Sequence, residues 1–278
     1  MGSRVNITTL SAMKQRGEPI TMLTCYDYPT ACFQDAAGVD LIFVGDSVGT
    51  NVLGYETPQQ VTMEDMIHHT RAVRRGVKEA LFVSDLPYAS YETPEQGLEN
   101  AKRLADAGAE VVKLEGGKEV TDRVAKIVAQ DIPIMGHVGF TPQTAGSGSP
   151  VVGSRAEEAV VLYDSVRALE DAGACAVVLE CVPERVAAII TKAFKIPTIG
   201  IGSGRVCDGQ VLVTPDLLGV NTRDLRFVKR YVELNKTIQK AFVDFVTDVK
   251  EGKFPGDDHR FLIKREELRR FRESIGAT

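Results

Sequence analysis

Five short apolar segments of this 278-residue chain each end on an ionisable residue. Apolar runs of about four to six residues that alternate with helical patterns are typical of buried parallel strands. In a closed α/β barrel the carboxyl ends of the strands surround one site. We therefore expect the residues that end the five segments to meet there. They are Asp46, Asp85, Glu115, His137 and Glu180.

Strand and helix patterns alternate along the chain, which predicts a single (βα)8 barrel of the TIM type. Seven strands are expected at 20–24, at 198–201 and in segments ending near 44, 84, 114, 136 and 179, with an eighth at 226–228. Helices are expected at 28–37, 63–75, 94–107, 119–130, 156–171, 183–193 and 231–250. An open doubly wound sheet would alternate similarly. It usually carries a glycine-rich turn after its first strand, and residues 24–27 contain no glycine.

The domain organisation is predicted from the absence of a Pro- or Ser-rich linker. We expect one catalytic domain over 1–278, with an N-terminal extension at 1–19 and a charged C-terminal tail at 251–278. The glycine-rich segment 144–153 is long enough to form a mobile loop over a site.

Composition restricts the partners. A net charge of -5 without a basic stripe argues against nucleic acid. The first twenty residues lack the apolar core of a secretory signal, and no apolar run approaches the ~20 residues that span a bilayer. We therefore expect a cytoplasmic protein with no membrane partner. Five cysteines without a CxxC pair suggest neither disulfides nor a zinc cluster, and Cys181 is interpreted as a packed thiol rather than a nucleophile.

Lys113 and Glu115 are predicted to point the same way, because side chains alternate along a strand. A lysine in an apolar strand costs several kcal/mol to bury without an anion. That anion is either a protein carboxylate, in a structural ion pair, or a bound ligand. The sequence leaves both alternatives open.

Asp46 and Asp85 have a structural alternative as well, since an acid after a strand often caps the next helix. The following helices, however, carry caps of their own at Thr62 and Thr93. Both acids are therefore candidates for a site.

The acids Asp46, Asp85 and Glu115 form an oxygen-rich set that suits Mg²⁺ or Mn²⁺ better than zinc. Such an ion can chelate a 2-oxo acid and stabilise the enolate formed when a base removes the proton α to the carbonyl. Glu180 is the candidate base. His137 either donates to the ligand or is a hydrogen-bonded structural residue.

The sequence resembles the ketopantoate hydroxymethyltransferase family. The likeness runs from about residue 8 to 261 and includes Gly-Asp-Ser at 45–47, Lys-Leu-Glu at 113–115 and Gly-His-Val-Gly at 136–139. Its other motifs lie at 22–28, 61–66, 84–87, 179–183, 199–202 and 207–210. The family's usual loop after the fifth strand differs here over 143–150.

The resemblance implies that 5,10-methylenetetrahydrofolate donates a one-carbon unit to 3-methyl-2-oxobutanoate, giving 2-dehydropantoate. It implies one Mg²⁺ per subunit and a homo-oligomer, by resemblance a decamer. Residue by residue, Asp46, Asp85 and Glu115 would hold the ion, and Ser47 and Lys113 would bind the oxo acid with the two aspartates. Glu180 would accept the proton at C3.

Two other functions fit parts of the pattern. A Mg²⁺-dependent lyase or mutase resembling phosphoenolpyruvate mutase and isocitrate lyase would share the enolate chemistry, but such enzymes commonly use a cysteine-bearing loop, and no Lys-Cys-Gly-His segment occurs here. A non-catalytic, metabolite-binding barrel would not need a spare base such as Glu180.

Overall fold

The computed structural model describes residues 4–144 and 150–277. Eight parallel strands close into a barrel in sequence order, with β1 paired to both β2 and β8. The predicted (βα)8 fold is confirmed. The strands are β1 (Ile20–Thr24), β2 (Leu41–Val44), β3 (Leu81–Asp85), β4 (Val111–Lys113), β5 (Ile134–Gly139), β6 (Ala176–Glu180), β7 (Thr198–Ile201) and β8 (Gly209–Leu212).

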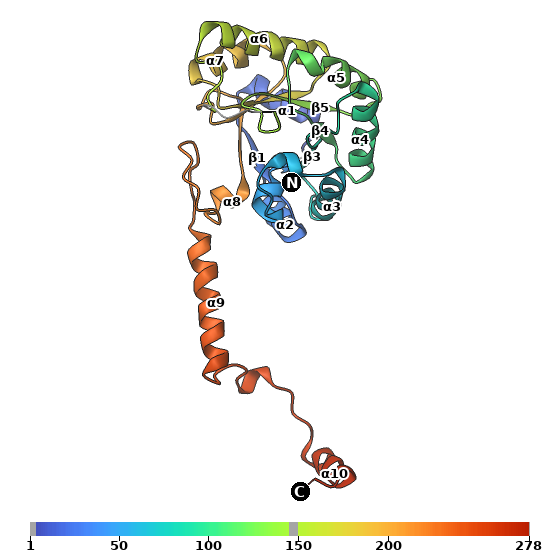
Figure 1. The fold of residues 1–278 in the computed structure, drawn as a ribbon, viewed down its shortest axis with the longest axis vertical. Coiled ribbons are helices and arrows are strands. Elements are labelled where there is room, and N and C mark those ends of the chain that lie inside the picture. The colour runs from blue at the N-terminus through green and yellow to red at the C-terminus, as the bar shows by residue number, and fades with distance from the viewer. Residues whose placement is uncertain (1–3, 145–149, 278) are drawn as a thin grey trace. The chain divides into compact units, whose positions relative to one another are not determined.

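The helices between the strands agree with the predicted positions to within three residues at each end. They are α2 (Tyr28–Ala36), α3 (Met63–Arg74), α4 (Pro94–Asp106), α5 (Thr121–Val128), α6 (Ala156–Asp171) and α7 (Glu184–Ala193). Figure 1 shows helices α4, α5, α6 and α7 on the outside of the strands. The caps expected for α3 and α4 are present, since Thr62 accepts from the backbone of Asp65 and Thr93 from that of Gln96. Shorter elements are η1 (Gly49–Leu53), η2 (Pro58–Gln60), η3 (Lys118–Val120) and α8 (Thr214–Leu217), and α1 (Ile7–Arg16) precedes the barrel.

The prediction of the eighth strand was wrong. β8 is Gly209–Leu212, paired with β7 and β1, whereas 226–228 lies in a turn. β8 alternates buried and more accessible residues and begins with glycine, so it lacks the continuous apolar run that identified the other strands. A Cβ on Gly209 would lie 2.6 Å from the carbonyl oxygen of Ile20, so the close approach of β1 requires glycine there.

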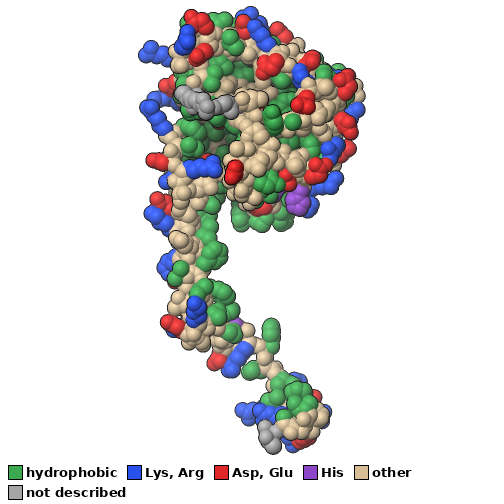
Figure 2. Space-filling model, in the orientation of Figure 1, with side chains coloured by type: hydrophobic (Ala, Val, Ile, Leu, Met, Phe, Trp, Pro, Cys, Tyr) green, Lys and Arg blue, Asp and Glu red, His purple; other side chains and the backbone are tan. Residues whose placement is uncertain are grey.

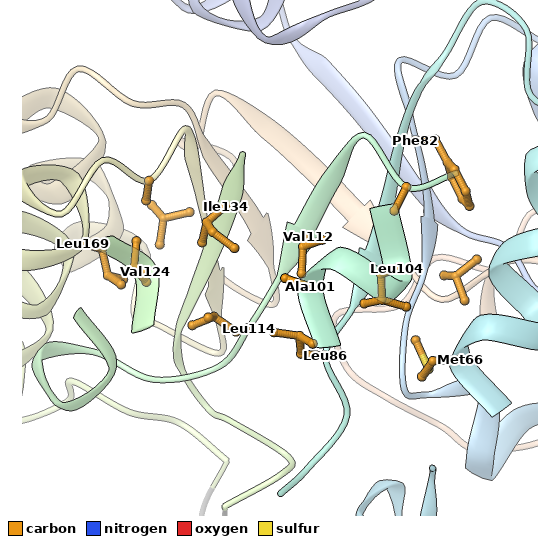
Figure 3. Close-up of a cluster of buried hydrophobic side chains, with 14 of the residues drawn as sticks. Met66, Phe82, Leu86, Ala101, Leu104, Val112, Leu114, Val124, Ile134 and Leu169 are labelled. Atoms are coloured by element: carbon orange, nitrogen blue, oxygen red, sulfur yellow. The ribbon is translucent and has the colours of Figure 1, made fainter. Parts of the chain in front are cut away.

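The core has two layers because successive strand residues point to opposite faces. Inside the barrel, Met22, Phe43, Val83 and Val178 pack together, and α1 adds Leu10 to this cluster. Between barrel and helices, the intervening strand residues meet the apolar faces of the helices. Figure 3 shows this outer layer: Met66, Phe82, Leu86, Ala101, Leu104, Val112, Leu114, Val124, Ile134 and Leu169.

The chain forms two compact units, Met1–Tyr231 and Val232–Thr278. The second contains α9 (Leu234–Lys250), η4 (Asp257–His259) and α10 (Arg265–Ile275). No residue of α9 is buried, and hydrophobic side chains run along it (Figure 2), among them Ile238, Phe242 and Phe245. Within the described part of the chain, no helix is both long and apolar enough to cross a membrane. The extension and tail boundaries, 1–19 and 251–278, stay predictions.

Candidate active site

A cavity of about 600 Å³ opens at the carboxyl ends of the strands. Its walls include apolar side chains from several strands, such as Met22, Phe43 and Val178. Every residue that sequence reasoning placed at the site contributes to this one cavity. They are Asp46, Ser47, Asp85, Lys113, Glu115, His137 and Glu180.

Asp85 and Lys113 are partners in the register of β3 and β4, which brings their side chains together. Lys113 Nζ donates to both carboxylate oxygens of Asp85, at 2.9 and 2.8 Å. Burial raises the pKa of Asp85, and the nearby ammonium offsets only part of that effect. Burial lowers the pKa of Lys113, but the negative charges of Asp85, Glu115 and Asp46 outweigh it, so the pKa is raised and the lysine stays charged.

His137 on β5 lies between two glutamates. Its Nδ1 is 3.2 Å from Oε1 of Glu115, and its Nε2 is 3.3 Å from Oε2 of Glu180. Burial and the charge of Lys113 lower the pKa of His137, but the two carboxylates outweigh them and raise it to about 9. Neither ring nitrogen makes a hydrogen bond of good geometry, so these contacts are ion pairs rather than aligned hydrogen bonds.

Asp46 lies two residues after the end of β2 and is buried. Burial, followed by the charges of Asp85 and Glu115, raises its pKa to about 8. Its backbone N–H lies 3.5 Å from Oδ2 of Asp85, so the two aspartates face the same space. Ser47 beside it pairs with the hydroxyl of Tyr26 at 2.8 Å.

Glu180 differs from the other acids in its accessibility. Its side chain is 17% exposed, compared with 1% for Asp85 and 2% for Glu115. A molecule in the cavity can therefore reach Glu180 most easily. Cys181 also lines the cavity, but burial and the neighbouring Glu180 raise the pKa of its thiol to about 11. A thiol with that pKa is a weak nucleophile near neutral pH.

Sequence reasoning missed Gln143 and Tyr91. Gln143 is 1% exposed and donates hydrogen bonds to both Asp46 and Glu115. The hydroxyl of Tyr91 donates to the side-chain oxygen of Gln143. Nothing in the periodicity of the chain marks these residues, because both lie outside the strands. The predicted loop 144–153 is described only at Thr144 and from Pro150 onward, and its segment 145–149 lies outside the described residues.

The chain matches the family described as ketopantoate hydroxymethyltransferase over residues 4–257. A 3-methyl-2-oxobutanoate hydroxymethyltransferase of Carboxydothermus hydrogenoformans is 49% identical over 272 residues, covering 96% of this chain and 99% of the relative. This chain belongs to the ketopantoate hydroxymethyltransferase family. A relative of the same name from Dehalococcoides mccartyi is 47% identical and covers 99% of both chains. The protein is therefore an enzyme, a transferase, as the sequence motifs predicted.

Solved structures outside the ketopantoate hydroxymethyltransferase family share the fold. A phosphonopyruvate hydrolase in complex with oxalate and Mg²⁺ has a TM-score of 0.62 at 12% identity and covers 98% of this chain and 96% of its own. A phosphoenolpyruvate phosphomutase from Streptomyces platensis has a TM-score of 0.62 at 14% identity and covers 98% of both. At such identities the likeness shows the fold alone.

The acidic side chains that line the cavity have the chemistry to bind a hard divalent cation. The carboxylates of Asp46, Asp85, Glu115 and Glu180 line the cavity together with Lys113 and His137, and carboxylate oxygens are the ligands that Mg²⁺ prefers. Over residues 4–144 and 150–277, no three His, Cys, Asp or Glu side chains stand close enough to form a ready-made ion shell. Binding an ion would therefore require the carboxylates to move closer together. Asp85 would then contact both Lys113 and the ion.

Proposed function

We propose that this enzyme transfers a one-carbon unit from 5,10-methylenetetrahydrofolate to 3-methyl-2-oxobutanoate and releases 2-dehydropantoate and tetrahydrofolate. The proposal combines family membership with the chemistry of the cavity. The observation that carries it is the placement of Glu180, whose side chain is 17% exposed, in the same cavity as the buried acids Asp46, Asp85 and Glu115. Glu180 is thus the candidate base, and the three buried acids form the candidate ion site.

The buried acids have the role of holding Mg²⁺ in this proposal. Asp46, Asp85 and Glu115 would supply its protein ligands. When bound, the ion supplies positive charge that stabilises the enolate oxygen of the substrate. The distribution of charge supports this assignment, because burial and mutual repulsion already raise the pKa of Asp46 to about 8. A cation among the acids relieves that repulsion.

Lys113 and Ser47 would bind the carboxylate and keto oxygens of the oxo acid, and the two aspartates would take part through the ion that they hold. Lys113 remains charged, since three carboxylates raise its pKa, and it can therefore attract the anionic substrate. The hydroxyl of Tyr26 is hydrogen-bonded to the hydroxyl of Ser47 at 2.8 Å and so orients the serine side chain. His137 would donate to the substrate from between its two glutamates.

Glu180 would accept the proton from C3 of 3-methyl-2-oxobutanoate. The electron pair of the broken C–H bond then forms the enolate, whose C3 attacks the methylene carbon of the folate. A carbon–carbon bond forms, both carbon–nitrogen bonds of the methylene bridge break, and water supplies the new hydroxyl group. The C3 proton and the second proton of the water end on the two freed nitrogens of tetrahydrofolate. Glu180 suits the first step because its side chain is accessible from the cavity while His137 lies against one of its oxygens.

The experiment that tests the proposed reaction follows ¹³C from labelled methylenetetrahydrofolate by NMR. With 3-methyl-2-oxobutanoate and Mg²⁺, the label should appear in a hydroxymethyl group on C3, and chelation of the metal should stop its appearance. Proton exchange at C3 without a labelled product would instead favour a lyase or mutase. Absence of both reactions would contradict the proposal.

Assembly into a homo-oligomer, with a decamer as the expected size, belongs to the same proposal. The exposed apolar side chains of α9, such as Phe242 and Phe245, support it, because apolar surface of this kind is usually covered by a partner. Sedimentation equilibrium should give about ten chains per particle, as family resemblance implies. A monomer would contradict the assembly.

A further inference from the structure

Gln143 connects two of the acids in the cavity. Its side-chain amide donates to Oδ2 of Asp46 at 2.9 Å, and its backbone N–H donates to Oε2 of Glu115 at 3.0 Å. Asp46 follows β2 and Glu115 follows β4, so one residue of the loop after β5 spans the two acids that flank Asp85 in barrel order. No other residue donates hydrogen bonds to both carboxylates among the contacts of the described chain.

The orientation of the Gln143 amide is fixed by its surroundings. The hydroxyl of Tyr91 donates to its Oε1, and the side-chain nitrogen also donates to the carbonyl oxygen of Leu86 at 2.9 Å. A reversed amide would place its oxygen against the carboxylate of Asp46 and the carbonyl oxygen of Leu86, and both of those hydrogen bonds would be lost. The N–H groups are therefore directed at Asp46, and buried hydrogen bonds of this kind hold a side chain in one place.

The hydrogen bonds leave one oxygen of each carboxylate without a contact to Gln143. Oδ2 of Asp46 and Oε2 of Glu115 are engaged, whereas Oδ1 of Asp46 and Oε1 of Glu115 are not. Oε1 of Glu115 faces His137 instead. Gln143 thus engages one oxygen of each of two mutually repelling carboxylates and leaves the other oxygen for a different contact, and it does so without adding charge. Groups that orient metal ligands in this way commonly change metal affinity by about 10- to 100-fold when removed.

We propose that Gln143 is the positioning residue of the ion site: its two hydrogen bonds fix the orientation of the carboxylates of Asp46 and Glu115, which then draw together when a divalent cation binds. The inference rests on the proposed function, since it takes these acids as ion ligands. Tyr91 fixes the amide of Gln143, and its hydroxyl also contacts the backbone N–H and carbonyl oxygen of Glu115, both at 3.3 Å. Neither residue touches the ion or the substrate in this assignment.

The test is a titration of the full-length protein with Mn²⁺ alone, without substrates, followed by electron paramagnetic resonance. Gln143→Met keeps the side-chain volume but removes the donor, and we expect its Mn²⁺ dissociation constant to rise about 10- to 100-fold. Gln143→Glu keeps the shape and the acceptor for Tyr91 while placing an acid against Asp46, and it should bind Mn²⁺ more weakly than the wild type. Tyr91→Phe should weaken binding in the same direction by a smaller factor.

Gln59 offers a matched control. Its side chain donates to the carbonyl oxygens of Pro142 and Gln143, at 2.9 and 3.2 Å, so it anchors the same loop without touching an acid. Gln59→Met should leave the Mn²⁺ affinity at the wild-type value. A decrease as large as that of Gln143→Met would show that loop anchoring alone matters and would overturn the proposal.

Other outcomes separate the inference from the proposed function. Wild-type affinity in Gln143→Met, or affinity in Gln143→Glu that equals or exceeds the wild type, would overturn the positioning role while leaving the reaction untouched. If Gln143→Met does not fold, the Tyr91→Phe titration decides, and unchanged affinity there would overturn the role. Failure of the wild-type protein itself to bind Mn²⁺ would contradict the ion site on which the proposed function depends.

Discussion

Lys113 Nζ lies 2.9 and 2.8 Å from the two carboxylate oxygens of Asp85, and both side chains are almost fully buried. The Lys113 ammonium therefore belongs to a buried ion pair and also lines the cavity. The sequence left two alternatives open for Lys113, an ion pair or a ligand contact. The position of its Nζ allows both. In the proposed function, a substrate carboxylate would contact Lys113 beside Asp85 rather than replace Asp85.

Removal of the Lys113 ammonium should destabilise the protein. Lys113→Met leaves the buried carboxylate of Asp85 without its partner, and we expect the free energy of unfolding to fall by about 3 kcal/mol. Urea denaturation measures the change. Lys118→Met is the control, because the ion pair of Lys118 with Asp164 is 60% and 33% exposed and should cost less than about 1 kcal/mol. Equal losses in the two variants would contradict the assignment of Lys113.

The stability of the metal-free protein should fall as pH rises from 6.5 to 9. His137 has its pKa raised from 6.5 to about 9, so its contribution is complete below pH 6.5 and is lost as pH passes the folded value. The raised pKa of Asp46, from 3.8 to about 8, acts in the same direction, because the folded state again binds the extra proton. Denaturation curves across this range should show a steady decrease in the free energy of unfolding.

The variant His137→Gln should reduce the slope of that pH dependence. It removes the group that titrates near pH 9 and leaves Asp46 in place. A wild-type stability that stays constant or increases between pH 6.5 and 9 would contradict the predicted protonation of His137.

Gly139 controls the position of Glu180. It has φ +100°, and a Cβ there would lie 2.2 Å from the carbonyl oxygen of Glu180, its register partner on β6. Gly139→Ala should displace that strand end, lower kcat by at least about tenfold and destabilise the protein. Gly38→Ala is the control. Gly38 has φ +80° with nothing within 4 Å of a Cβ, so that change should cost about 1 kcal/mol and leave kcat unaltered.

Cys181 should not take part in the reaction. With its pKa raised to about 11, only about one thiol in ten thousand is ionised near neutral pH. Cys181→Ala should therefore retain the wild-type kcat within about threefold. Steady-state kinetics checks this expectation. Loss of activity in the variant would favour the cysteine-dependent lyase chemistry that the sequence left as an alternative.

Seven strands and the convergence of the site residues could be predicted because buried parallel strands need uninterrupted apolar runs. The ends of those runs then place Asp85, Lys113 and Glu180 at one edge of the barrel. β8 could not be found in this way, since Gln210 interrupts its pattern and its identity depends on pairing with β1 and β7. The segment 226–228 that was mistaken for it supplies Phe227 and Val228 to the cavity wall, beside Leu225.

The contacts of Gln143 were beyond sequence reasoning for a different reason. They depend on the path of the loop after β5, which brings a polar side chain back across the cavity to Asp46. A glutamine after Pro142 carries no periodic signal, and its burial becomes evident only when the strands are arranged in a barrel. The same holds for Tyr91, whose hydroxyl reaches the loop from the segment before α4.

The central claim is that Glu180 removes the C3 proton while Asp46 and its neighbours hold the ion. Incubation with 3-methyl-2-oxobutanoate and Mg²⁺ in deuterated water, without folate, tests it most directly by NMR. The wild type should exchange the C3 proton for deuterium, Glu180→Gln should lose exchange, and Asp46→Ala should reduce it strongly. Undiminished exchange in Glu180→Gln, or no exchange in the wild type, would contradict the account.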